Sequence, residues 1–330
     1  EVIHAGLYYP PASLKAEACI EGRELVYERC ARQEIPHREI GKWIVAVEEA
    51  ERSALEAIAA QAEAAGAGSL GWLDAAAIRR REPQLRAIAA LESPRTGIVD
   101  ALALLGSYQA EFEARGGTLV CNTRVVGFER AGRGWRVEAL AAAGERVDCV
   151  AGAVVNAAGL EADRIAEGCG IDIEAAGWRQ RACRGDYFAV EGPSAAPVQR
   201  LIYPLPSDGG LGIHVSLDLA GRARFGPDVE YVVRSEAGEL ANAAPPGAEK
   251  AVEFAGAVAR YLPSLAGASL VYEMSGFRAR LGAPGEGFRD FVLASGGDFG
   301  APGTFHLIGI ESPGLTASPA LARRVADAIA

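Results

Sequence analysis

The C-terminal segment of this sequence constrains its fold more than any other. Residues 307–310 are apolar and predict a strand, residues 309–318 form a turn rich in Gly, Ser, Pro and Thr, and a helix continues to Ile329. The first N–H groups of a helix have no partner inside it, so such a turn presents free donors and a positive helix end to a ligand. The segment predicts an α/β fold with an anion-binding turn, or else a tight turn with no ligand.

Composition limits the classes of partner. The 330 residues are half hydrophobic and 23% charged, which is typical of a globular enzyme with a large core or two domains. The net charge of −10 and the lack of a basic block argue against nucleic acid and anionic lipid. No apolar run is long enough for a transmembrane segment. An anionic substrate would therefore need a local arginine to bind.

Two further features bear on the origin of the chain. The sequence begins at Glu1 and its one methionine is Met274, which predicts a fragment without its natural N-terminus. The cysteines form no CxxC pair and no His lies at zinc-like spacing, which predicts reduced thiols, no metal site and a cytoplasmic protein.

Hydrophobic periodicity predicts a mixed α/β (α+β) chain. Helices are expected over residues 13–32, 48–65, 73–81, 101–115 and 248–261, with Asp74 as an N-cap. Residues 118–149 predict strands that include a β-meander, and the apolar strand 153–157 is typical of a parallel sheet covered on both faces. Mostly antiparallel strands follow from residue 184. We therefore expect a Rossmann-like nucleotide-binding domain interleaved with an antiparallel-sheet domain.

A literal GxGxxG sequence occurs at residues 66–71. The dinucleotide fingerprint needs a strand before it and a helix directly after it, so that the pyrophosphate meets the helix end. Here an Ala/Glu-rich helix precedes the glycines, so we interpret the segment as a loop between helices.

Two side chains are candidates for substrate chemistry. Arg278 lies in an apolar context at residues 276–280 and could hold a carboxylate by two hydrogen bonds, or form a structural ion pair. His214 lies in the apolar segment 212–217 and could be a base facing a cavity, or a buried core histidine. Of the other histidines, His37 is predicted at the surface and His306 in a structural role.

Four blocks together resemble the D-amino-acid-oxidase-like superfamily of FAD-dependent oxidoreductases, and most closely the L-2-hydroxyglutarate dehydrogenases and oxidases. The blocks are residues 1–15, 96–100, 155–160 with 184–187, and the run of segments from 203 to 316. Their order and spacing hold over essentially the whole chain. The resemblance implies FAD as cofactor, an FAD/NAD(P)-binding domain over 1–38, 90–180 and 275–330, and a substrate-binding domain over 39–89 and 181–274.

The resemblance also implies roles for individual residues. Those expected near the flavin are His4, Gly6, Gly309, Gly314, Leu315 and Thr316. Those expected near the adenine, ribose and phosphates are Val125, Val126, Ala157, Ala158 and Gly159. Arg278 would bind the substrate carboxylate, His214 would take the hydroxyl proton as hydride leaves Cα for the flavin N5, and Tyr203 would add a hydrogen bond.

Several alternatives stay open at this point. An amine oxidase of the same fold, acting on glycine, sarcosine or another amino acid, would need no dedicated base, and a glycerol-3-phosphate substrate would need an Arg cluster that the sequence does not reveal. The first βαβ unit of the superfamily, about forty to fifty residues, is missing, so the chain could be a non-binding remnant with an exposed apolar sheet edge. The electron acceptor could be oxygen, an electron-transfer protein or a quinone, and a quinone would imply peripheral contact with the inner membrane.

Overall fold

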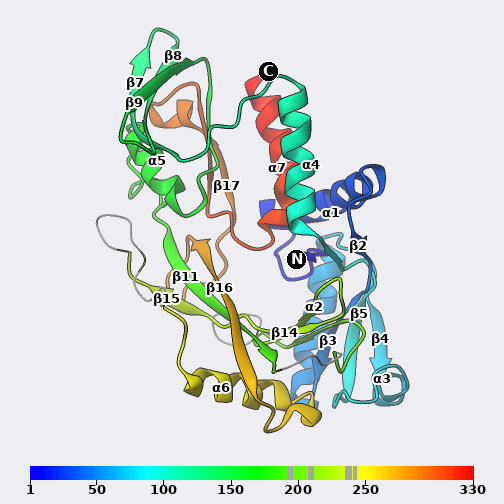
Figure 1. Ribbon diagram of the computed structural model, residues 1–330. Coiled ribbons are helices and arrows are strands. Elements are labelled where there is room, and N and C mark those ends of the chain that lie inside the picture. Colours follow the sequence, from blue (N-terminus) through cyan, green and yellow to red (C-terminus); the bar gives the residue numbers. More distant parts are fainter. Residues whose placement is uncertain (192–195, 207–211, 235–239, 241–243) are drawn as a thin grey trace.

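A computed structural model describes residues 1–191, 196–206, 212–234, 240 and 244–330. The chain has the expected mixed α/β architecture, with one large sheet in the lower half of Figure 1 and small sheets and helices above it. The helices are α1 (Leu14–Arg32), α2 (Arg52–Ala64), α3 (Ala75–Arg81), α4 (Ala101–Ala114), α5 (Ala162–Gly168), α6 (Ala248–Ala259) and α7 (Gly314–Ile329).

The large sheet has nine strands in the order β15-β11-β14-β13-β12-β3-β5-β4, with β16 also paired to β11. Their bounds are β3 (Lys42–Ala46), β4 (Gly71–Asp74), β5 (Ala89–Ser93), β11 (Arg181–Val190), β12 (Leu201–Pro204), β13 (Val215–Leu217), β14 (Ala223–Phe225), β15 (Glu230–Val232) and β16 (Leu270–Arg280). Among the described strands of this sheet, β12 and β3 are the only pair that runs parallel. The aromatic core between the sheet and α6 includes Phe188 and Phe254, whose ring centroids are 4.6 Å apart.

The longest ladder of this sheet joins β11 to β16. It runs from Arg181 opposite Arg280 to Val190 opposite Leu270, with one irregularity after Tyr187. In Figure 1 the two strands extend from the large sheet toward the small sheets above it. The C-terminal end of β16 therefore lies close to the region that holds the C-terminal turn.

The remaining strands form three small sheets. These are β1 (Val2–Ile3), β6 (Gly97–Val99) and β2 (His37–Arg38); β10 (Val154–Asn156), β18 (Thr304–Ile308) and β17 (Val292–Ser295); and the meander β7 (Thr123–Ala131), β8 (Gly134–Ala141) and β9 (Arg146–Ala151). The apolar strand β10 pairs in parallel with β18, as its composition predicted. Among the described residues β10 has no second neighbour, and the side chain of Val155 is 44% exposed.

Helices α1 and α7 pack against each other. Their contact depends on Gly22, because a Cβ at that position would lie 2.1 Å from the carbonyl oxygen of Thr316. His306 is fully buried on β18 and is within hydrogen-bond distance of Asn156 and Thr304. Its predicted structural role is therefore confirmed: it ties β18 to β10.

Several predicted boundaries are wrong. Of residues 118–123 only Thr123 is in a strand, since Gly116 and Gly117 are followed by an extended loop rather than paired backbone. Helix α7 begins at Gly314 and continues through Pro319. Pro319 has no N–H to donate to the Leu315 carbonyl, and Ser318 Oγ donates to that carbonyl instead.

The loop at residues 66–71 lies between α2 and β4, which is the reverse of the order that the dinucleotide fingerprint requires. The N-cap prediction is confirmed, because the Asp74 carboxylate accepts from the Ala77 N–H at 2.7 Å. The division into two domains stays a prediction; β5, at one predicted boundary, and β16, at another, both pair in the large sheet.

Candidate active site

A cavity of about 610 Å³ lies where the large sheet meets the C-terminal turn. Its lining brings together residues that are far apart in the sequence: His4, Tyr203, His214, Arg278 and Gly314. All three predicted catalytic side chains therefore face one space, next to the start of α7.

His214 lies directly before β13 and is only 6% exposed. Its ring stacks on that of Tyr203 with centroids 3.8 Å apart and an interplanar angle of 15°. Burial lowers the pKa of His214 to about 3, and Lys42 and Arg278 act in the same direction, against the hydrogen bond to Gly212. The imidazole is therefore neutral at physiological pH and can accept a proton.

Arg278 projects from β16 opposite Cys183 of β11. Its Nη2 donates to two main-chain carbonyls, that of Asp228 at 2.7 Å and that of Arg184 at 3.3 Å. Among the residues that the structure describes, no ion pair joins Arg278 to a carboxylate. Neutral partners fix the guanidinium in place while its charge stays available to an anionic ligand.

His4 follows β1 and connects the N-terminal segment to the C-terminal turn. Its backbone N–H donates to Thr316 Oγ1 at 3.0 Å, and its Nε2 lies 3.3 Å from Ser312 Oγ. Burial, Lys42 and the N-terminal ammonium all lower the pKa of His4, to about 3. The cavity thus contains a second neutral imidazole.

Lys42 is a buried cation beside the cavity that sequence reasoning missed. It is 1% exposed, and its Nζ lies 4.7 Å from the ring centroids of both Tyr8 and Tyr203. Within the described part of the chain no carboxylate pairs with it. Burial lowers its pKa from 10.5 to about 7. Its position in the apolar segment 40–47 was the only signal that the sequence offered.

Arg224 is a second guanidinium in the same cavity, and it was also missed. It lies on β14 and pairs with Glu273 of β16 at 2.7 Å, with both side chains somewhat more than a quarter exposed. Tyr187 lines the cavity between the two arginines, and burial raises its pKa to about 12. The cavity therefore offers two guanidinium groups and protonated phenols to a ligand.

A second, apolar cavity of about 480 Å³ adjoins the first. The two cavities share Gly159, Ile310 and Gly314, and the second continues along α7 past Val155 and Ala157. No side chain caps the first turn of α7, the Gly314 N–H donates to the Glu311 carbonyl, and the positive end of the helix lies at the junction. A long cleft with small residues and a helix N-terminus at its centre fits an extended dinucleotide such as FAD.

The other residues expected at the cofactor are placed as follows. Gly6 and Gly309 both have positive φ; Gly6 packs on Ile20, and Gly309 N donates to Gln180 Oε1 at 2.6 Å. Ala158 is exposed in the turn after β10. Val125 and Val126 lie on β7, outside the lining of either cavity, and Val126 is the extra residue of a β-bulge. Their roles stay predictions.

Fold and site together define an oxidoreductase of the dinucleotide-cofactor class, with a substrate cavity set against a helix N-terminus. Residues 1–328 match the family described as FAD dependent oxidoreductase, so the chain belongs to the DAO family of FAD-dependent oxidoreductases. It is an enzyme of that family and FAD is its cofactor.

Individual relatives agree with this assignment. The chain is 35% identical to a mitochondrial L-2-hydroxyglutarate dehydrogenase of Arabidopsis thaliana, over 99% of this chain and 74% of the relative. It is 30% identical to the human enzyme of the same name, over 99% and 78%.

Among solved structures, an L-α-glycerophosphate oxidase of Mycoplasma pneumoniae with FAD bound superposes with a TM-score of 0.85 at 22% identity, over 99% of this chain and 83% of that one. A glycine oxidase of Geobacillus kaustophilus gives 0.77 at 19% identity, over 99% and 82%. In the described part of the chain, no helix combines the length and hydropathy needed to cross a membrane.

Proposed function

We propose that the enzyme oxidises an L-2-hydroxy acid that carries a second carboxylate, of the L-2-hydroxyglutarate class, to the 2-oxo acid. The observation that carries the proposal is a single cavity lined by Arg278, Arg224 and the neutral His214 beside the start of α7. The relatives named L-2-hydroxyglutarate dehydrogenase support the same substrate class.

The two arginines divide the binding of such a substrate. Arg278, held by main-chain carbonyls, takes the carboxylate next to the reacting carbon. Arg224, whose charge is shared with Glu273, takes the distal carboxylate. Two fixed anchors define the orientation of the Cα–H and hydroxyl groups between them, which lowers the entropic part of the barrier.

His214 acts as the base. Its Nδ1 lies 3.2 Å from the Gly212 carbonyl, so this nitrogen carries the hydrogen and Nε2 is left to accept the substrate hydroxyl proton. Burial raises the pKa of Tyr203 well above 10, so its phenol stays protonated and can donate to the substrate. Bound FAD supplies the two-electron acceptor for the hydrogen on Cα, and the start of α7 would hold its flavin end.

Anaerobic mixing of the FAD-loaded protein with L-2-hydroxyglutarate tests the proposal. Rapid bleaching of the flavin absorbance is expected, with much slower bleaching by the D-enantiomer and by L-lactate. Bleaching by glycine or sarcosine but not by the hydroxy acid would contradict the proposal and favour an amine oxidase. Reoxidation of the bleached protein by oxygen, a quinone or an electron-transfer protein would then identify the acceptor.

A further inference from the structure

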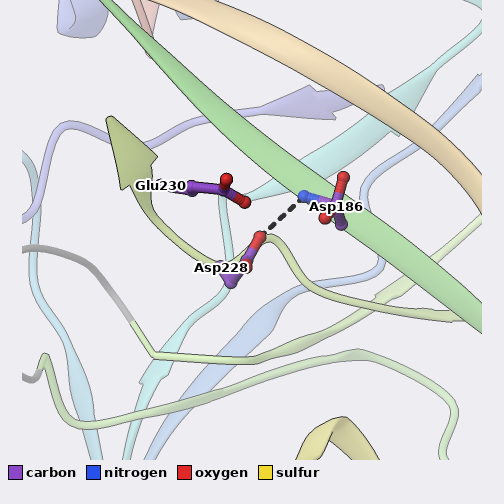
Figure 2. Close-up of side chains that lie close together, drawn as sticks. All are labelled: Asp186, Asp228 and Glu230. Atoms are coloured by element: carbon purple, nitrogen blue, oxygen red, sulfur yellow. Dashed lines mark hydrogen bonds between the residues drawn. The ribbon is translucent and has the colours of Figure 1, made fainter. Parts of the chain in front are cut away.

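Three carboxylates meet at one end of the large sheet, behind Arg278. Asp186 lies on β11, Asp228 precedes β15 and Glu230 begins it, and one carboxylate oxygen of each lies within 4.8 Å of the others (Figure 2). Asp186 is completely buried. Three like charges this close repel strongly in a poorly solvated site, so the group needs a cation.

Two cations meet this need: the guanidinium of Arg184, whose Nε lies 2.7 Å from Asp186 Oδ1, and, in contact with all three carboxylates, the ammonium of Lys250. Its Nζ contacts Asp186, lies 2.7 Å from Asp228 Oδ2 and is 3.1 Å from Glu230 Oε2, with its side chain 17% exposed. Burial alone would lower the pKa of Lys250, but the hydrogen bonds that its ammonium donates to all three carboxylates raise it well above 10.5. We call the side chains of Asp186, Asp228, Glu230 and Lys250 the carboxylate cluster. Its geometry could hold a metal ion, and the ammonium occupies the centre instead.

Lys250 lies near the start of a helix, where a positive charge is electrostatically unfavourable, so its contacts with the three carboxylates must offset that cost. Lys250 is the third residue of α6, where the positive end of the helix dipole disfavours a cation. An ordinary surface lysine would be more stable in the last turn of the helix. The contacts with the carboxylates offset the unfavourable placement.

The carboxylate cluster reaches Arg278 through Asp228. The Asp228 side chain is held twice, by Lys250 at Oδ2 and by the Asp186 N–H at Oδ1, 2.7 Å away (Figure 2). The main-chain carbonyl of the same residue accepts the shortest hydrogen bond of Arg278, at 2.7 Å. A shift of Asp228 would therefore move the guanidinium that faces the cavity.

We infer that Lys250 is a positioning residue for substrate binding: its ammonium draws Asp186, Asp228 and Glu230 together and so sets the carbonyl that orients Arg278. The inference rests on the proposed role of Arg278. Without the ammonium, the carboxylates repel, the segment around Asp228 moves away from β11, and Arg278 loses one of its two neutral partners. The base and the cofactor cleft are untouched, so binding of the substrate carboxylate suffers more than the chemical step.

The test compares Lys250→Met with a control variant that disrupts a buried ion pair away from the cavity. Glu82→Gln breaks another buried ion pair, which joins the residue after α3 to Arg200 directly before β12 at 2.6 Å, and neither residue lines the cavity. In Lys250→Met we expect KM for L-2-hydroxyglutarate to rise about tenfold while kcat stays within about threefold of the parent. The dissociation constant of malonate, read from the flavin spectrum, should rise by the same factor as KM. Glu82→Gln should lose similar thermal stability with KM and malonate binding unchanged.

A second readout does not depend on the bound cofactor. Amide hydrogen exchange should be faster at Asp186 in Lys250→Met, because its N–H loses the Asp228 acceptor, and unchanged there in Glu82→Gln. If Lys250→Met does not fold, Lys250→Gln removes the charge but keeps an N–H donor for the carboxylates, and it should raise KM about threefold. A folded, FAD-loaded Lys250 variant with parental KM and parental exchange at Asp186 would overturn the inference.

Arg278→Lys separates this result from the proposed function. If Arg278→Lys raises KM but the Lys250 variants do not, only the positioning inference fails. If Arg278→Lys leaves both KM and malonate binding unchanged, the proposed role of Arg278 fails, and the inference fails with it.

Discussion

Lys42 and Lys250 are both withdrawn from water, but their surroundings are opposite. Lys42 lies between two aromatic rings beside the cavity, and no carboxylate pairs with it in the described residues. Lys250 lies among three carboxylates behind Arg278. Burial lowers the pKa of Lys42 to about 7, whereas hydrogen bonds raise the pKa of Lys250 despite its burial.

The comparison distinguishes two roles of charged side chains. Those around the cavity are available to a ligand, whereas those of the carboxylate cluster pair with one another inside the fold. Around the cavity, Lys42 and Arg278 have no carboxylate partner among the described residues, whereas Arg224 pairs with Glu273, so the first two charges are available to an anionic substrate and a reduced flavin. In the carboxylate cluster the three carboxylates share the Lys250 ammonium, and Asp186 also pairs with Arg184, so the gain is a fixed geometry rather than binding. We therefore expect cavity substitutions to cost activity, and cluster substitutions to cost stability and alignment.

The largest expected effect is at Arg278. In Arg278→Met we expect kcat/KM for L-2-hydroxyglutarate to fall about 10³-fold, since two charge-assisted hydrogen bonds to the substrate are lost. The melting temperature should stay near that of the parent, because the guanidinium has only neutral partners. Steady-state kinetics and thermal unfolding measure the two quantities; a large loss of stability with little loss of activity would place Arg278 with the structural charges.

His214→Gln tests the base. Loss of a general base should slow anaerobic flavin reduction about 10²-fold, with little change in malonate binding. Gln has a similar reach and can keep the hydrogen bond to Gly212, which limits structural damage. Flavin reduction as fast as in the parent would show that His214 is not the base, and an amine substrate would then be the better explanation.

Lys42→Met sharpens the comparison because stability and activity should move in opposite directions. Between pH 7 and 10.5 the unfolded chain keeps a proton on Lys42 that the folded chain has lost, so stability of the parent rises with pH there. At pH 7 the variant should gain up to about 4 kcal/mol, and the pH-dependent rise should disappear. Flavin reduction should slow about tenfold as the local positive charge is removed.

Chemical denaturation at pH 7 and pH 9 checks the stability part of this prediction. The control is Lys250→Met, which should be less stable than the parent at both values, because the Lys250 ammonium is protonated throughout and its removal leaves the carboxylates unpaired. If both variants lost the same free energy of unfolding, the two lysines would not differ in their effect on stability, and the comparison would be wrong.

The smallest effect is expected at Arg224. In Arg224→Gln the preference for L-2-hydroxyglutarate over L-lactate should fall about tenfold, since Arg224 already shares its charge with Glu273. Activity with L-lactate should stay within about twofold of the parent, which excludes a general defect. An unchanged preference would assign Arg224 to the structural ion pairs.

Local patterns of sequence predicted much of the fold. The helices at 14–32 and 101–114, the meander and the parallel pairing of β10 follow from periodicity, capping and apolar composition over short windows. The start of α7 was misjudged, because turn residues and a proline can lie inside a helix when a side chain satisfies the freed backbone carbonyl.

The candidate site was predictable in part. His214 and Arg278 are single polar residues in apolar segments, and this contrast is visible in sequence. Arg224 and Lys250 have no such contrast, since their importance comes from partners on other strands, 49 residues away for Glu273 and 64 for Asp186. The sequence shows Lys42 as a lysine within an apolar segment, but it does not show that aromatic rings lie on either side of its ammonium.

The ladder between β11 and β16 has a mechanical consequence. Arg278 lies two residues before Arg280, whose Nε is 3.6 Å from Glu311 in the C-terminal turn, and both arginines are on the ladder. The side chain proposed to anchor the substrate is thus connected to the turn beside the cofactor cleft through one ladder and one ion pair. Moving Arg278 relative to Arg280 would require breaking consecutive backbone pairs, whereas moving the turn relative to both arginines would first break the contact between Arg280 and Glu311. Any adjustment between substrate and cofactor is therefore expected at this ion pair and not within the ladder.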